Sequence, residues 1–348
     1  MPVYHCRETL SQIVPLLLKW FAENARVLPW RGIRNPYFTW VSEIMLQQTR
    51  VEQVKSYYLR FIAEVPDIQA LADLPEERLL KLWEGLGYYS RVKNMQKAAG
   101  IIMEKHNGVF PQNYADIIEL PGIGEYTAGA ILSIAFDLPV PAVDGNVLRV
   151  LSRVLESRQD IALPETKRVM TESLREIYPD KNCGDLTQSL MELGATVCLP
   201  NGEPLCLICP LNHLCKASQN HTTNIIPFKT AKKPRIIENY TILILRSNTG
   251  KLALKKRPAR GLLASLWELP SLPGHLNESE IHAYLKEHHI SCKNIKKSVS
   301  GKHIFTHKEW LMNSFELVCD KESEHFVWAS PEELETHFSL PSAYKLFL

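Results

Sequence analysis

Hydrophobic positions in the first two-thirds of the chain recur every three or four residues. The pattern runs over residues 10–21, 147–155 and 186–197, with Pro15 inside the first of these stretches. This spacing is typical of helices that bury one face. Short connectors that contain Pro or Gly separate the stretches, as expected between helices. The pattern predicts an all-helical domain over residues 1–215.

The pattern changes after residue 215. Residues 216–236 show no period and carry several Lys, Asn and Thr residues, which favours a linker. Shorter apolar runs follow, and Ser247–Gly250 is typical of a hairpin turn. We expect strands over 240–245, 251–255, 310–318 and 326–329 and a helix over 278–289. Residues 237–348 therefore form a small α/β domain in this interpretation.

Length and composition agree with two globular domains. The chain has 348 residues, of which 45% are hydrophobic and 22% are charged. No apolar run approaches the roughly 18 residues of a membrane-spanning helix. The run Ile13–Leu18 is too short for the core of an export signal and leads into Lys19. We expect a cytoplasmic protein without a membrane partner.

Charge is distributed unevenly, although the formal net charge is only +2. Residues 1–215 hold 21 basic and 25 acidic residues, whereas residues 216–348 hold 19 and 13. Within residues 216–260 there are 11 basic residues and one acid, Glu238. Such a run is either a solvated surface or a patch that faces phosphates.

Four cysteines fall within 18 positions at the end of the predicted helical domain. They are Cys198, Cys206, Cys209 and Cys215, with gaps of seven, two and five residues. Four thiolates so close together predict a metal site, and the spacing alone fits zinc and a [4Fe–4S] cluster about equally. We expect the scattered cysteines to be ordinary buried thiols: Cys6, Cys183, Cys292 and Cys319.

Two segments offer acidic residues and a glycine turn. Gly122 and Gly124 precede a small-residue helix, so their turn either binds a phosphate at the helix N-terminus or simply reverses the chain. Asp144 opens the next periodic stretch, either as an N-cap or as a carboxylate at the mouth of a cleft. Glu43 has apolar neighbours in the sequence. It is either buried, which would raise its pKa, or exposed on the surface of a helix.

Taken together, these segments resemble the MutY-type adenine DNA glycosylases, which are helix-hairpin-helix proteins with an iron–sulfur loop. The resemblance covers nearly the whole chain and is carried, in order, by residues 28–31, 40–49, 85–91, 120–131, 144–147 and 198–215. It implies a mainly α helix-hairpin-helix glycosylase domain followed by an α/β Nudix-like domain. It also implies that the cysteines hold a [4Fe–4S] cluster and that Gly122 and Gly124 clamp a DNA phosphate.

The resemblance implies a role for individual residues in the removal of a flipped adenine. Glu43 matches the general acid, and Asp144 matches the carboxylate that stabilises or traps the oxocarbenium-like sugar. Tyr126 and Asn146 match residues that support this pair. Contacts to adenine or to the opened base stack are expected from Trp30, Arg31, Gln48, Thr49, Leu86, Tyr88 and Gln188. Bifunctional relatives have a nucleophilic Lys in place of Tyr126, so the enzyme is expected to be monofunctional.

The resemblance also implies how the partner base is read. The C-terminal domain lacks an acid-rich Nudix box, since only Glu268 stands between Gly261 and Pro270. In this family the module recognises 8-oxoguanine, and Phe305, Thr306 and His307 stand where many members have Phe-Ser-His. The expected partner is therefore double-stranded DNA with adenine opposite 8-oxoguanine or guanine, bound by a monomer.

Two other classes of function remain as alternatives. A non-catalytic DNA-binding or redox-sensing protein would keep the cysteines and the hairpin without the chemistry. A bifunctional glycosylase for pyrimidine lesions would need an amine nucleophile. The presence of Glu43 and Asp144 argues against the first, and Tyr126 argues against the second. We also expect the basic residues 229–260 to contact DNA.

Overall fold

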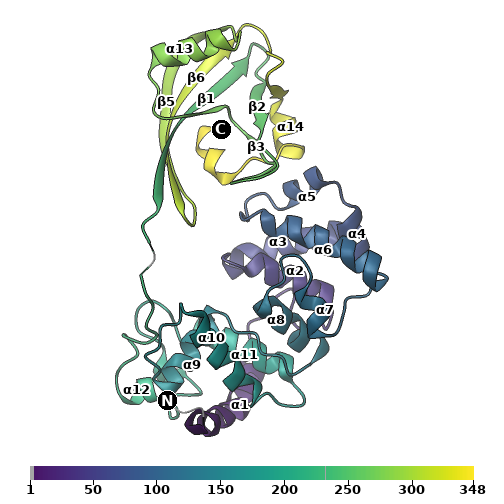
Figure 1. Ribbon diagram of the computed structural model, residues 1–348, viewed down its shortest axis with the longest axis vertical. Coiled ribbons are helices and arrows are strands. Elements are labelled where there is room, and N and C mark those ends of the chain that lie inside the picture. Colours follow the sequence, from purple (N-terminus) through teal and green to yellow (C-terminus); the bar gives the residue numbers. More distant parts are fainter. Residues whose placement is uncertain (1–3, 232) are drawn as a thin grey trace. The chain divides into compact units, whose positions relative to one another are not determined.

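The computed structural model describes residues 4–231 and 233–348, with side chains from residue 7 onward. The chain divides into two compact units (Figure 1). The helical unit is formed by Met1–Asp73 and Asn94–Ala231, and the sheet unit by Leu74–Lys93 and Lys232–Leu348. The predicted limits at residues 215 and 237 did not anticipate that Leu74–Lys93 groups with the C-terminal residues. In the described part of the chain, no helix has the length and apolar character needed to cross a membrane.

The helical unit confirms the helices predicted from apolar spacing. The three predicted stretches lie in α1, α9 and α11. The helices that lie wholly in this unit are α1 (Tyr4–Asn24), α2 (Pro36–Leu46), α3 (Val51–Glu64), α4 (Ile68–Asp73), α7 (Tyr114–Ile118), α8 (Glu125–Phe136), α9 (Gly145–Leu155), α10 (Pro164–Arg175), α11 (Cys183–Thr196) and α12 (Lys216–Gln219), with the 3₁₀ turn η1 at Cys206–Ile208. Helix α6 (Ser90–His106) begins in the sheet unit, which also contains α5 (Glu76–Leu82).

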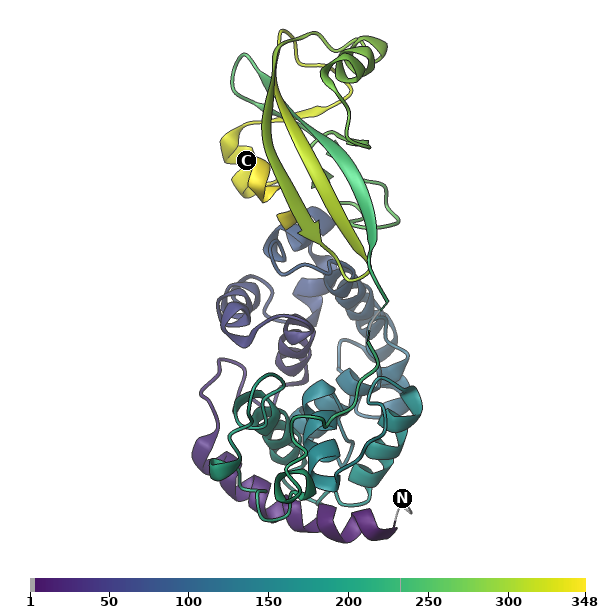
Figure 2. The same cartoon turned by 90° about the vertical axis from the view of Figure 1, so that its left-hand side faces the viewer.

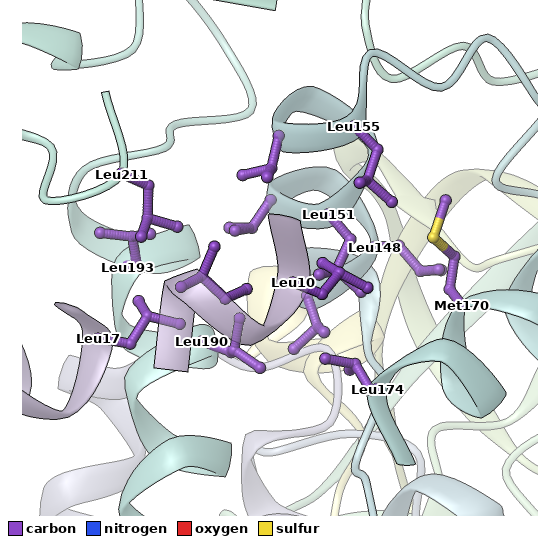
Figure 3. Packing of buried hydrophobic residues seen from close by; sticks show 14 of the residues in the cluster. Leu10, Leu17, Leu148, Leu151, Leu155, Met170, Leu174, Leu190, Leu193 and Leu211 are labelled. Carbon is purple, nitrogen blue, oxygen red and sulfur yellow. The ribbon is translucent and has the colours of Figure 1, made fainter. Parts of the chain in front are cut away.

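Helix α1 continues through Pro15 and packs its apolar face onto the centre of the helical unit. Leu10 and Leu17 lie against leucines of α9 and α11, together with Leu174 of α10 (Figure 3). The cysteine loop contributes Leu211 to the same cluster, and Cys198, Cys209 and Leu214 pack against it. Burial of this apolar surface therefore fixes α9 and α11, the two helices that bear Asn146 and Gln188.

The first part of the predicted linker is held against the helical unit. Helix α12 opens it, and Ala217 is buried beside Cys215 and Ile226. Glu156, at the end of α9, accepts hydrogen bonds from Asn220 and Thr222. We call residues 216–231 the strap segment. It contacts α9, the cysteine loop and the loop between α9 and α10, which the lack of any apolar period in the sequence did not indicate.

The sheet unit is built on a mixed sheet with the strand order β3-β2-β1-β6-β5, to which β4 and β7 add pairings with β1 and β2. The three long strands β1, β6 and β5 run side by side (Figure 2). β1 pairs with β6 in parallel along its whole length and with β2 and β4 antiparallel. The strands are β1 (Ile236–Ser247), β2 (Leu252–Lys256), β3 (Trp267–Glu268), β4 (Ser271–Pro273), β5 (Cys292–Ile304), β6 (Lys308–Cys319) and β7 (Val327–Ala329).

Helical segments cover both faces of this sheet. Helix α13 (Glu278–Glu287) lies beside the long strands in Figure 1. Its buried residues Ile281 and Leu285 pack on one face of the sheet. The 3₁₀ helix η2 (Ser342–Phe347) covers the other face, next to α14 (Pro331–Thr336). Residues 241–245 of β1 are consequently buried without interruption. This double cover explains why the central strand is an apolar run and not an alternation.

Strand β5 was not predicted from the sequence. It pairs only with β6 in the sheet order, and most of its 13 residues are exposed. Its Lys residues, including Lys296 and Lys297, leave no apolar alternation to detect. Charged side chains are a common feature of edge strands, because they oppose pairing with another chain. The position of β5 at the edge of the sheet therefore explains why its sequence shows no alternation of apolar and polar residues.

The scattered cysteines require one correction. Cys292 and Cys319 are register partners on β5 and β6 and form a disulfide, so their assignment as ordinary thiols was wrong. Sequence spacing gave no sign of this pair, because 27 positions separate the two residues. Cys183 is a free, buried thiol, as expected. The side chain of Cys6 lies outside the described part of the chain.

Candidate active site

A cavity of about 510 Å³ opens in the helical unit, and it brings together all four predicted catalytic residues and several of the predicted substrate-binding residues. Helices α2, α8, α9 and α11 and the loops at residues 26–31 and 47–51 contribute to its lining. The predicted residues that line it are Trp30, Arg31, Glu43, Gln48, Thr49, Tyr126, Asp144, Asn146 and Gln188. Its size is within the range of pockets that bind small molecules or single bases.

Glu43 is buried on α2, where the hydrophobic face of that helix carries it into the cavity wall. The Tyr126 hydroxyl of α8 donates a hydrogen bond to Glu43 Oε2 at 2.6 Å. Burial raises the pKa of Glu43 to about 7, against the lowering effect of the Tyr126 hydrogen bond, and the nearby Asp144 charge adds to the rise. A carboxyl group with this pKa can both give and take a proton near neutral pH.

Asp144 occupies the N-cap position of α9. Its Oδ1 accepts from the backbone N–H of Val147 at 2.8 Å, and its Oδ2 accepts from Asn146 Nδ2 at 2.8 Å. Burial raises the pKa of Asp144, and these hydrogen bonds oppose the rise because they favour the ionised form. The two interpretations of Asp144 are thus combined: the residue caps a helix and also presents a carboxylate to the cavity.

A buried arginine that the sequence reasoning missed fixes Asn146. Arg149 Nη2 donates to Asn146 Oδ1 at 2.9 Å and to the carbonyl oxygen of Gly194 at 2.7 Å. Arg149 Nε donates to the carbonyl oxygen of Cys198 at 2.8 Å. The guanidinium therefore connects Asn146, which donates a hydrogen bond to Asp144, with α11 and with the start of the cysteine loop.

Close helix packing around the cavity depends on glycine. A Cβ atom on Gly194 of α11 would lie 2.6 Å from the Cβ of Asn146. A Cβ on Gly184, at the start of α11, would lie 2.8 Å from the carbonyl oxygen of Ser133. Glycine at these positions lets α11 approach α8 and α9, which brings Gln188 to the cavity.

A second group of charges forms the α11 side of the cavity. Glu192 is buried and accepts from Arg26 Nε at 2.6 Å and from Arg31 Nη2 at 2.7 Å. Burial alone would raise the pKa of Glu192, but the hydrogen bonds from both arginines outweigh burial and lower it to about 2. Arg31 Nε also donates to Gln188 Oε1 at 3.3 Å. Arg26 and Glu192 were not predicted; Glu192 stands four residues after Gln188, on the same helical face, which could have indicated it.

The predicted hairpin connects α7 to α8. Gly122 has φ of +81°, and a Cβ there would lie 2.7 Å from the Cβ of Asn94, so glycine is required. Gly124 is the N-cap of α8 and has ordinary extended geometry. Neither glycine lines the cavity. The hairpin presents the first-turn N–H groups of α8, which is the geometry of an anion site, and Glu125 of that turn lies 3.8 Å from Lys167.

The four clustered cysteines line one small cavity at the loop between α11 and α12. Within the described residues, no three His, Cys, Asp or Glu side chains are grouped as ligands of a single metal ion. The donor set nevertheless suits an iron–sulfur cluster, because four thiols face one cavity whose other walls include Val197 and Leu205. Arg153 also lines this cavity, and its Nη1 lies 3.3 Å from Cys198 Sγ.

The remaining predicted residues belong to the sheet unit. Leu86 is buried, whereas Tyr88 is exposed at a positive φ of 48°. Phe305, Thr306 and His307 form the turn between β5 and β6, where Phe305 packs against Trp310 and Thr306 is exposed. The hydroxyls of Tyr88 and Thr306 are hydrogen-bonded at 3.0 Å within this unit.

Acidic partners pair with part of the basic stretch at residues 229–260. Arg246 pairs with Glu316 at 2.8 Å, and Lys251 pairs with Glu322 at 3.7 Å. Lys256 pairs with Glu77, and Arg257 pairs with Glu268. Lys233 and Lys255 are exposed, and Lys232 lies outside the described residues. Part of the positive charge of this stretch is therefore already paired with acidic residues from other segments.

Comparisons with known proteins find one family in the N-terminal part of the chain and another in its C-terminal part. Residues 41–179 match the family described as HhH-GPD superfamily base excision DNA repair protein, and residues 241–348 match the NUDIX domain. The chain is 37% identical over 307 residues to the adenine DNA glycosylase of Buchnera aphidicola subsp. Baizongia pistaciae, covering 88% of this chain and 86% of that protein. It is 34% identical to the human adenine DNA glycosylase, covering 77% and 59%.

Solved structures show the same helical fold. A thermostable thymine-DNA glycosylase matches with a TM-score of 0.56 and 26% identity, covering 61% of this chain and 98% of that chain. A trapped endonuclease III–DNA covalent intermediate matches with a TM-score of 0.52 and 25% identity, covering 64% and 99%. The fold and the family match indicate a base-excision DNA glycosylase. The similarity to adenine DNA glycosylases over most of both chains is more specific, and it shows that the chain belongs to the adenine DNA glycosylases of the HhH-GPD superfamily.

Proposed function

We propose that this protein removes adenine that is mispaired with 8-oxoguanine or guanine in double-stranded DNA, and that it leaves an abasic site. The observation that carries the proposal is the pair of buried carboxyl groups in one cavity. Glu43 has a pKa near neutrality and Asp144 is oriented by a helix N-terminus. Hydrolysis of a glycosidic bond needs a proton donor and a carboxylate that faces the developing positive charge on the sugar.

Glu43 is the proton donor in this mechanism. Because its pKa is about 7, a substantial fraction of the groups is protonated at neutral pH. Adenine lies inside the duplex, so it must first be flipped into the cavity. Proton transfer to the adenine ring lets the base leave as a neutral molecule. Tyr126, which donates to Oε2, keeps the carboxyl group in place.

Asp144 then stabilises or traps the sugar cation. Its hydrogen bonds from Val147 and Asn146 hold the carboxylate in one orientation and favour its ionised form. Glu43, deprotonated after base release, takes the proton of the attacking water. These are the two roles of the carboxyl pair in retaining glycosidases.

The α11 side of the cavity fits recognition of adenine. Glu192 accepts but cannot donate, because its pKa of about 2 keeps it ionised. The Gln188 amide offers a donor beside the acceptor that Arg31 already uses. An array with both acceptors and donors suits adenine, whose edge presents an amino donor next to ring-nitrogen acceptors. Guanine has a carbonyl oxygen at the corresponding position and would face Glu192 unfavourably.

The lining of the cavity supports a monofunctional enzyme. Tyr126 stands where a Schiff-base mechanism needs an amine, and no Lys is found among the described residues that line the cavity. We therefore expect base release without strand cleavage by this enzyme.

The sheet unit is proposed to read the base opposite adenine. In the turn Phe305–His307, at the end of the β5–β6 hairpin, Thr306 and His307 are exposed, and Thr306 shares a hydrogen bond with Tyr88. The Thr306 hydroxyl can therefore serve as a polar contact to 8-oxoguanine, while its added methyl group narrows the space beside it. Gln48, Thr49 and Leu86 are proposed to fill the stack from which adenine has been flipped.

DNA and a [4Fe–4S] cluster complete the proposal. The first-turn amides of α8 suit a DNA phosphate, and a monomer supplies all the residues named above. Cys198, Cys206, Cys209 and Cys215 would hold the cluster, which would cross-link the ends of their loop. The expected place of action is the DNA-containing compartment of the cell.

Single-turnover base release on three duplexes tests the function. We expect fast loss of adenine opposite 8-oxoguanine, slower loss opposite guanine and none opposite thymine. Intact binding without adenine release from any duplex would contradict the proposal and favour a non-catalytic DNA-binding role. A protein–DNA adduct trapped by borohydride at high yield would contradict the monofunctional mechanism.

A further inference from the structure

Arg153 is a buried arginine that the proposed chemistry does not use. It lies on α9, one turn after Arg149, and contacts the cysteine cavity. Its Nη1 donates to Cys198 Sγ at 3.3 Å and to the carbonyl oxygen of Leu199 at 2.9 Å. Its Nε donates to Ile226 and its Nη2 to Thr223, both carbonyl oxygens, at 2.8 and 2.9 Å. One guanidinium thus joins a cysteine ligand to the strap segment.

The charge of this guanidinium needs a counter-charge. It donates to three carbonyl oxygens and one sulfur, and the described residues that line the cavity include neither Asp nor Glu. A buried cation is costly unless an anion lies nearby. Deprotonated cysteine ligands would supply that negative charge. The placement of Arg153 is therefore explained by a loaded cysteine site.

We propose that Arg153 is a positioning residue of the cluster, which donates a hydrogen bond to the Cys198 thiolate and makes the order of the strap segment depend on cluster loading. The inference rests on the proposed [4Fe–4S] cluster. Hydrogen bonds and positive charge beside the ligand sulfurs stabilise the more negative, reduced form of a cluster. Arg153 consequently raises the reduction potential.

The strap segment, which precedes the sheet unit in the sequence, is attached to the helical unit by several hydrogen bonds besides those of Arg153. Arg153 holds residues 223 and 226, while Glu156 holds residues 220 and 222. Further along, the backbone N–H of Ile161 donates to the carbonyl oxygen of Phe228 at 3.1 Å. Loss of the negative charge at the cysteines leaves Arg153 uncompensated, which weakens the central attachment of this segment.

The test compares the full-length wild type with Arg153→Met, Arg153→Lys and the control Arg168→Met. Arg168 is exposed and pairs with Glu165 and Glu172 on its own helix. Iron and sulfide content establish loading, spectroelectrochemistry gives the midpoint potential, and trypsin cleavage after Lys229 reports on the strap segment. We expect Arg153→Met to have a more negative potential and several-fold faster cleavage, with Arg168→Met unchanged. Cluster-free wild type should also be cleaved several-fold faster.

The outcomes separate the two proposals. Wild type that contains zinc, or no iron and sulfide, contradicts the cluster itself. Loaded wild type with the same potential and cleavage rate in Arg153→Met overturns the role of Arg153. If Arg153→Met retains no cluster, the role of Arg153 is tested with Arg153→Lys. This variant keeps the positive charge, but its single ammonium group cannot reproduce the forked geometry toward all four acceptors. A more negative potential or faster cleavage of Arg153→Lys supports the inference, and wild-type values of both overturn it.

Discussion

The two sides of the cavity treat buried carboxyl groups in opposite ways. On the side formed by α2 and α9, Glu43 and Asp144 are bonded to a phenol, an amide and a backbone N–H. On the α11 side, Glu192 is bonded to the guanidinium groups of Arg26 and Arg31. The pKa of Glu43 rises to about 7, whereas that of Glu192 falls to about 2.

This difference shows that the partner, and not burial alone, decides what a buried acid can do. Neutral donors hold Glu43 in place without neutralising it, so the energetic cost of its charge remains and the group stays protonatable. Cationic donors remove that cost for Glu192, which becomes a permanent acceptor. In the sheet unit, Arg246 and Lys251 of the basic stretch are likewise bound to acidic partners, whereas Lys233 and Lys255 are exposed.

Replacing the unpaired acid should have the largest effect. Glu43→Gln keeps the shape of the side chain but cannot transfer a proton, so we expect base release to fall about 10²- to 10⁴-fold. DNA affinity should be retained. Single-turnover kinetics and a binding titration measure the two quantities. Glu165→Gln, an exposed residue of α10, is the matched control, and an unchanged rate in Glu43→Gln would sink the mechanism.

The same variant tests the cost of burying Glu43. The pKa of Glu43 is higher in the folded protein, about 7, than its ordinary value of 4.5. The protonated acid therefore contributes stability that is fully present below pH 4.5 and is lost as the pH rises through 7. Glu43→Gln should accordingly gain thermal stability over wild type at pH 8 and not at pH 4. Equal differences in Tm at both pH values would contradict the raised pKa.

Replacing the paired acid should have a smaller and different effect. Glu192→Gln leaves Arg26 and Arg31 without their charged partner, so we expect base release to fall about 10- to 100-fold. The Arg31 charge already lowers the pKa of Glu43, and without Glu192 to compensate this charge the lowering should be stronger. The alkaline limb of the pH–rate profile, set by protonated Glu43, should therefore move to lower pH. A limb that stays in place would mean that the two sides are electrostatically independent.

The distance between α9 and α11 can be altered with one methyl group. Gly194→Ala places a Cβ 2.6 Å from the Cβ of Asn146, so it should destabilise the fold by about 1–3 kcal/mol and slow base release. Gly100→Ala, in α6, meets nothing within 4 Å and should stabilise by about 0.5–1 kcal/mol. Chemical denaturation measures both, and equal signs for the two substitutions would contradict the close packing at Gly194.

The smallest effect concerns the basic stretch of the sheet unit. Lys233→Gln and Lys255→Gln remove exposed charges, whereas Arg246→Gln and Lys251→Gln remove charges that already have acidic partners. If the stretch binds DNA, each exposed lysine that neutralises a phosphate should contribute about 0.9 to the slope of log affinity against log salt concentration. The first pair should therefore reduce this slope, and the second pair is the control. Equal slopes for all four variants and the wild type would argue against DNA binding by this stretch.

Local patterns in the sequence predicted most of the helical unit. Apolar spacing identified α1, α9 and α11, because a helix that buries one face records this face at a period of 3.6 residues. The same period gave no sign of β5, whose exposed edge position removes the apolar alternation. The parallel pairing of β1 with β6 was also not foreseen, since it joins segments about 70 positions apart.

The sequence by itself determined the candidates for the site: Glu43, Tyr126, Asp144, Asn146 and Gln188 stand in short segments whose order resembles that of a known family, and all five line one cavity. Only the tertiary structure decided how these groups behave. It showed that Glu192 is held by two arginines, that Arg149 links Asn146 to the cysteine loop, and that Cys292 and Cys319 are bonded. The reason is physical: a residue type and its neighbours are local properties, whereas pKa, pairing and burial depend on groups that folding brings together from distant positions.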